Sequence, residues 1–101
     1  MCLIVLAWHQ REDAPLLLAA NRDEFHERPT ARADFWVDEP QVLAGRDLRA
    51  GGTWLGLSRG GRFATITNIR DPEGTSPAGA RSRGELVAQF LTSRQAPEPF
   101  L

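Results

Sequence analysis

The sequence predicts an α+β fold made of antiparallel hairpins and one amphipathic helix. Two pairs of β-rich runs, each pair joined by turn-forming residues, indicate two hairpins. A capping-box pattern before a run of apolar residues at helical spacing indicates the helix. At 101 residues, with 42% apolar and 25% charged residues, the chain has the size and composition of one globular domain or part of one.

Two apolar runs near the N-terminus predict the first hairpin. Residues 3–8 form a continuous apolar run of strand length, and residues 16–20 form a second. The polar turn between them, which ends at Pro15, favours a hairpin over a short helix at 16–20. Consecutive apolar residues are typical of strands that are covered on both faces.

Residues 25–50 show no regular periodicity, and we expect a long irregular connection there. Pro29, Pro40 and Gly45 interrupt the stretch, which mixes charges of both signs. Loops of this length in compact domains tend to be functional or fixed by specific contacts. The second hairpin is predicted after it, with β-rich runs at residues 51–58 and 62–68 on either side of a glycine turn.

The helix is predicted over residues 83–93. Residues 82–85 have the capping-box pattern, and four apolar residues share one helical face: Leu86, Val87, Phe90 and Leu91. One helix covers only part of one sheet face, so apolar strand surface remains without cover. We therefore expect residues 1–101 to form a single partial domain that self-associates or is completed by a C-terminal remainder.

Composition and charge exclude several classes of protein. Twelve basic residues against thirteen acidic ones give a net charge of −1, which provides no broad positive surface for nucleic acid or anionic membrane. No apolar run reaches the roughly 18 residues of a membrane span, and the N-terminal run lacks the features of a signal peptide. With one cysteine and two histidines without metal spacing, we expect a cytoplasmic protein that uses no metal or cofactor.

Cys2 is the candidate nucleophile. Methionine aminopeptidases remove Met1 when the second residue is small, so the mature chain would begin with Cys2. Its free α-amino group is then a plausible general base for its own thiol. The alternative is a small buried residue that opens the first strand, because free cysteines are among the most buried residue types.

Four polar residues, 21–24, follow the second apolar run directly. In a hairpin they lie at the same end as Cys2. Arg22 could then stabilise the thiolate and bind an anionic group of the substrate, and Asp23 could orient the amine. A solvated turn is the alternative.

Three further positions complete the candidate site. Asn68 ends the second hairpin, where its amide could donate to an oxyanion or could simply form a turn. Trp54 is most simply a core or rim aromatic residue. We expect Trp54, together with Asn21 and Glu24, to contact a small-molecule substrate or ligand.

Several motifs in order resemble one known family. They are MCLI at 1–4, AANRDEF at 19–25, RP at 28–29, GGTWLG at 51–56, TN at 67–68 and RGEL at 83–86. The chain resembles the NRDE family, which is the transport and Golgi organisation protein 2 family, over nearly its whole length. Members are longer, and the chain is similar to their N-terminal part.

The resemblance implies a fold and a chemistry. The family is similar to N-terminal nucleophile hydrolases, whose αββα sandwich of antiparallel sheets begins at the nucleophile, and to the cysteine acylases of the bile-salt hydrolase and penicillin V acylase group. It implies Cys2 as nucleophile, assisted by Arg22 and Asp23, with Asn68 as oxyanion donor. In those acylases the aspartate lies three residues beyond the arginine, where this chain has Phe25.

The activity implied is hydrolysis of an amide bond in a small acylated molecule. The alternative on the same scaffold is a non-catalytic protein that binds or traffics haem or acyl-CoA lipids.

Overall fold

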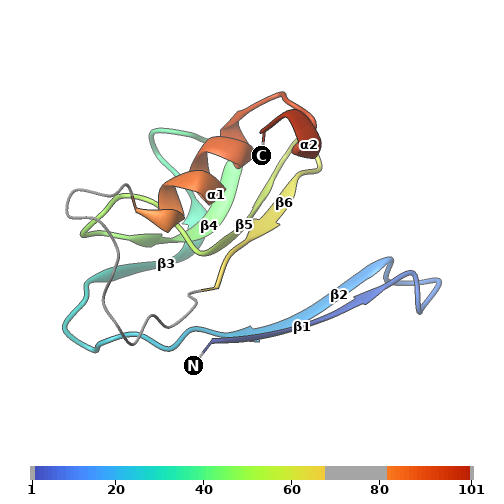
Figure 1. Ribbon diagram of the computed structural model, residues 1–101, viewed down its shortest axis with the longest axis horizontal. Helices are drawn as coiled ribbons and strands as arrows, with labels where there is room; N and C mark the ends of the chain where they lie inside the picture. Colours follow the sequence, from blue (N-terminus) through green and yellow to red (C-terminus); the bar gives the residue numbers. More distant parts are fainter. Residues whose placement is uncertain (1, 68–81, 101) are drawn as a thin grey trace.

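The fold is mixed α/β, consists mostly of strands, and has antiparallel sheets (Figure 1). The computed structural model describes residues 2–67 and 82–100. In order, the elements of this part are β1 (Leu3–Trp8), β2 (Leu16–Asn21), β3 (Thr30–Phe35), β4 (Val42–Asp47), β5 (Leu55–Ser58), β6 (Phe63–Thr65), α1 (Arg83–Thr92) and α2 (Pro97–Phe100).

The predicted first hairpin is confirmed. β1 and β2 pair antiparallel, with Leu3 opposite Asn21 and Trp8 opposite Leu16. The run at 16–20 is therefore a strand and not a short helix. The described residues do not cover both faces of this hairpin, because Leu3 and Val5 are 62% and 59% exposed.

The expected irregular connection over residues 25–50 is wrong, because it contains β3 and β4. β4 buries Val42 and Ala44 under the helix, while Gly45 and Arg46 hide this alternation in the sequence. β3 carries exposed charged residues, and its register with β4 shifts between Ala31 and Asp34. Such strands are stabilised by pairing with distant segments and not by local propensity.

The remaining elements complete a four-stranded sheet in the order β3-β4-β5-β6. The predicted second hairpin is confirmed as β5 and β6, with Gly61 in the turn at φ 88°. β6 ends at Thr65, and Asn68 lies outside the described residues.

The predicted helix is confirmed as α1, with Val87 and Leu91 buried against the sheet. Its N-cap residue Ser82 makes no side-chain capping bond, so the serine half of the predicted capping box does not form. A second, short helix that the sequence did not predict, α2, follows at Pro97–Phe100. Phe100 of α2 packs edge-on against Phe90, with the ring centroids 5.3 Å apart.

The elements form three layers (Figure 1). α1 lies across one face of the four-stranded sheet and packs against β5, β6 and β4. The β1–β2 hairpin lies on the other side of this sheet, away from α1. The hydrophobic core sits between α1 and the sheet and consists of Trp36, Val42, Ala44, Val87 and Leu91.

A backbone contact between two glycines anchors α1 on the sheet. The N–H of Thr53 donates to the carbonyl oxygen of Gly84 over 3.2 Å. A Cβ atom on Gly52 would lie 2.5 Å from the carbonyl carbon of Gly84, closer than any side chain can approach. Two separate sequence motifs, 51–56 and 83–86, are therefore parts of one packing contact.

We expect Gly52→Ala to lower the free energy of unfolding by about 1–3 kcal/mol, because the added methyl group has no space against Gly84. Urea unfolding followed by circular dichroism measures the effect. Gly60→Ala is the matched control: its Cβ would meet only the Ser58 hydroxyl at 3.8 Å, so a change within ~0.5 kcal/mol is expected. Equal stability of the two variants would contradict the proposed contact.

The exposed outer face of the hairpin should cause self-association. Leu3 and Val5 share the strand face opposite to the one that carries Ile4. Val5→Thr keeps the β-branched shape and should reduce association measured by light scattering at micromolar concentration. Val37→Thr, at a residue that is 99% exposed and lies outside the hairpin, is the control and should change nothing. A monodisperse monomer of the unsubstituted chain would contradict the prediction.

Candidate functional site

The hairpin register places Cys2 beside residues 21–24, as predicted. The N–H of Leu3 donates to the side-chain oxygen of Asn21 over 3.0 Å, which closes this end of the hairpin. The N–H of Asp23 donates to the sulfur of Cys2 over 3.3 Å. The backbone of Asp23 thus contacts the thiol directly and fixes its position.

Cys2 lines a cavity of about 330 Å³ between the hairpin and the four-stranded sheet. The hairpin side contributes Cys2 itself, Ile4, Leu18, Ala20, Asn21 and Arg22; the sheet side contributes Trp54, Leu55, Thr65, Ile66 and Thr67. The cavity therefore brings together four of the expected site residues, namely Cys2, Asn21, Arg22 and Trp54. Asp23 and Glu24 do not line it, and Thr67 does, directly before Asn68.

The guanidinium of Arg22 is held at this cavity by three contacts. Its central carbon lies 4.2 Å from the centre of the Trp54 ring, a cation–π contact. One terminal nitrogen donates to the hydroxyl of Thr30 over 3.2 Å, and the other lies 3.8 Å from a carboxylate oxygen of Glu24. Glu24 therefore acts on Arg22 and not on the cavity itself.

An ion pair that the sequence analysis missed connects this segment to the sheet. Two nitrogens of Arg28 donate to one carboxylate oxygen of Asp47, over 3.0 and 2.5 Å. The other carboxylate oxygen accepts the N–H of Arg49 over 3.0 Å and that of Ala50 over 3.4 Å. The hydrogen bond from Arg28 lowers the pKa of Asp47 below its usual range and raises that of Arg28. The Arg-Pro motif at 28–29 was the sequence signal for this ion pair, and no motif pointed to Asp47 as the partner.

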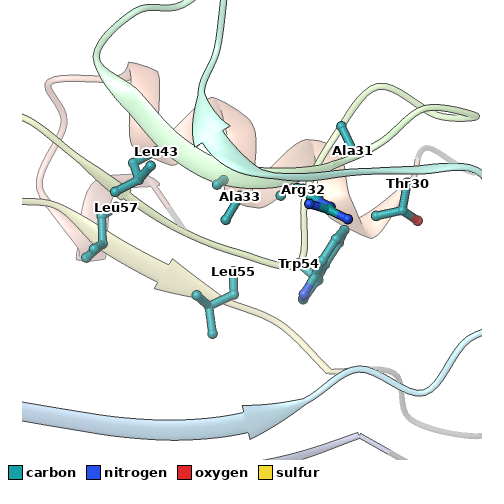
Figure 2. Close-up of a pocket in the computed structure, with 10 residues that line it drawn as sticks. Thr30, Ala31, Arg32, Ala33, Leu43, Trp54, Leu55 and Leu57 are labelled. Atoms are coloured by element: carbon teal, nitrogen blue, oxygen red, sulfur yellow. The ribbon is translucent and has the colours of Figure 1, made fainter.

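A second, larger cavity of about 440 Å³ adjoins the first and shares Trp54 and Leu55 with it. Figure 2 shows side chains of β3, β4 and β5 around it. Its lining is mostly apolar and includes Ala31, Ala33, Leu43 and Leu57. Arg32 and Thr30 lie at the end nearest Trp54 (Figure 2).

Residues 2–67 and 82–100, which the structure describes, contain neither a metal-binding cluster nor a membrane-spanning helix. No three histidine, cysteine, aspartate or glutamate side chains of this part gather closely enough to hold a metal ion. No helix of the same part is long and apolar enough to cross a membrane.

The fold and the cavity define a mixed α/β protein in which Cys2 lines a partly enclosed cavity between the N-terminal hairpin and the four-stranded sheet. The chain belongs to the family described as Transport and Golgi organisation 2, which matches residues 1–101.

Named relatives agree with this family. The chain is 48% identical over 100 residues to a Transport and Golgi organization protein 2 homolog of Bos taurus, covering 92% of this chain and 36% of that protein. It is 44% identical over 100 residues to the Homo sapiens homolog, with the same shares. Identity to Transport and Golgi organization protein 2 of Drosophila melanogaster is 38% over 81 residues, covering 76% of this chain and 29% of that protein. The chain thus spans about a third of the length of the first two relatives.

We expect Asp47→Asn to lower the free energy of unfolding by about 2 kcal/mol at pH 7, because charge-assisted hydrogen bonds are lost. The folded pKa of Asp47 is depressed, so its stabilising effect is present above the unfolded pKa and is lost as pH falls through the folded value. The difference from the unsubstituted protein should therefore shrink below about pH 4.

Urea unfolding at a series of pH values measures this difference. The control is Asp13→Asn, which removes an exposed pair with Arg11 and should cost less than ~0.5 kcal/mol. A difference for Asp47→Asn that stays constant through acid pH would show that the charge of Asp47 is not the cause.

Proposed function

We propose that this chain is the N-terminal part of a cysteine hydrolase of the N-terminal nucleophile type, which cleaves an amide bond of a small acylated molecule. The observation that carries the proposal is the cavity lined jointly by Cys2, Arg22 and Trp54. The arrangement of α1, sheet and hairpin is compatible with three layers of an αββα sandwich, with Cys2 at the start of the first strand. A cytosolic setting, in which a lone thiol stays reduced, suits this chemistry.

The reaction proceeds in two steps once Met1 has been removed. The free α-amino group takes the proton of the Cys2 thiol, and the sulfur attacks the amide carbonyl carbon. The carbon–nitrogen bond breaks, the proton passes to the leaving amine, and a thioester to Cys2 remains. Water then attacks the thioester, which releases the carboxylic acid and restores the thiol.

The neighbouring residues have separate roles in this proposal. Arg22 supplies the positive charge beside the thiol, and the N–H of Asp23 holds the sulfur. The side chain of Asp23 orients the α-amino group. Asn68 donates to the oxyanion of the tetrahedral intermediate, a role taken from the resemblance alone. Asn21 contacts the substrate from the cavity wall, and Glu24 acts through Arg22.

The second candidate function is non-catalytic binding and trafficking of haem or an acyl-CoA lipid. The larger cavity favours it, because an open and mainly apolar lining suits an apolar ligand. The relatives' names refer to transport and Golgi organisation, which describes those proteins. A carrier has no need of a free cysteine terminus, and this separates the two functions.

We expect intact-mass spectrometry of native protein to show a chain that begins at Cys2. Incubation with short-chain acyl p-nitroanilides should then give a transient mass increase equal to the acyl group, with release of p-nitroaniline. Cys2→Ala should abolish both signals.

The sharper control inserts one glutamate between Met1 and Cys2, which keeps the thiol but blocks removal of Met1. This variant should form no thioester. Retention of Met1 in all native protein, or equal acylation of the inserted variant, would overturn the mechanism.

A further inference from the structure

The Trp54 ring, which lies against the Arg22 guanidinium, is itself held in place by its neighbours. A Cβ atom on Gly45 would lie 2.9 and 3.0 Å from two ring carbons of Trp54, so only glycine at this position of β4 leaves space for the indole. The carbonyl oxygen of Trp54 accepts the N–H of Ile66 over 3.0 Å and the hydroxyl of Thr65 over 2.9 Å. The indole is therefore fixed from the β4 side and through its own backbone.

Thr30 sets the direction of the Arg22 guanidinium on this support. Its hydroxyl accepts from Arg22 over 3.2 Å and donates to the carbonyl oxygen of Arg28 over 3.3 Å. A ring face alone would let the planar guanidinium rotate, whereas a hydrogen bond at one nitrogen fixes it. The Arg22 side chain is about 21% exposed, so its contacts are screened only in part.

The charge of the cavity beside Cys2 follows from this arrangement. Arg22 is the one charged side chain among the described residues that line it. A fixed cation in a partly enclosed, mainly apolar space attracts anions more strongly than the same cation in water. An opposing charge, the carboxylate of Glu24, lies 3.8 Å from Arg22 and outside the lining.

We propose that Gly45, Trp54 and Thr30 are positioning residues that hold Arg22 as an anion receptor beside Cys2, so that the preferred substrate carries a carboxylate or similar anion near its reacting carbonyl. The inference deepens the proposed function, on which it rests for the identity of the reacting sulfur. It also changes the expected role of Trp54 from a substrate contact to a support for Arg22.

Alkylation of the thiol tests the receptor without any substrate. Cys2 is the one cysteine of the sequence, so modification is unambiguous. Iodoacetate and iodoacetamide both form a sulfur–carbon bond to the Cys2 thiolate and release iodide, but only iodoacetate is an anion. The thiolate population is common to both reactions and cancels from the ratio of their rate constants, which then reports attraction of the anion.

We expect Arg22→Gln to lower the iodoacetate-to-iodoacetamide ratio about fivefold, because one unit charge near the reacting anion is removed. Trp54→Leu, Gly45→Ala and Thr30→Val should each lower it about twofold to threefold. The conservative variants Trp54→Phe and Thr30→Ser should keep the ratio, since ring face and hydroxyl remain. Glu24→Gln should raise it, which is the opposite sign.

Arg11→Gln, at an exposed pair at the hairpin tip, is the control for net charge and should leave the ratio unchanged. An unchanged ratio in Arg22→Gln would overturn the receptor. A decrease in Arg22→Gln with no decrease in Thr30→Val and Trp54→Leu would overturn the positioning roles. If the ratio responds as expected while no thioester forms with the nitroanilides, the hydrolase proposal fails and the receptor stands.

Discussion

Trp54 is the residue on which the arrangement of the site depends. Its backbone carbonyl joins β5 to the end of β6 through Ile66 and Thr65, and its ring lies against Gly45 of β4. The same ring supports Arg22, which follows β2. Through its backbone and its ring, this one residue connects three strands of the sheet with the segment that follows the Cys2 hairpin, and it lines both cavities.

The elements that sequence reasoning predicted are those defined by local pattern. The hairpin of β1 and β2, the hairpin of β5 and β6, and α1 all have turn residues or a helical period within their own sequence. β3 and β4 were not predicted because their own sequences show no clear strand pattern. They are strands because they pair with segments distant in the sequence, as Ala44 does with Gly56. The mixture of charged residues in this region is typical of a loop. In the structure, however, Arg46 and Asp38 form a bidentate ion pair.

The same distinction holds for the site. The proximity of Cys2 and residues 21–24 followed from hairpin register, a short-range property that sequence can supply. The placement of Arg22 on Trp54, and the ion pair of Arg28 with Asp47, join residues about 20 to 30 positions apart in the sequence. No periodicity encodes such contacts, and they were visible only as unexplained glycine and arginine-proline motifs. Asn68 lies outside the described residues, and its role stays a prediction.

The four-stranded sheet with α1 contributes more to the stability of the fold than the exposed hairpin does. The buried core lies between α1 and the sheet, and the described part contains no comparable apolar layer on the outer hairpin face. Three polar contacts join the segment after the hairpin to the rest of the fold: the cation–π contact of Arg22 with Trp54, its hydrogen bond to Thr30, and the Arg28–Asp47 pair. Polar contacts of this kind are individually weak but directional. They hold Arg22 and the segment after it against the sheet, whereas the buried apolar core that stabilises the fold lies on the α1 side of the sheet.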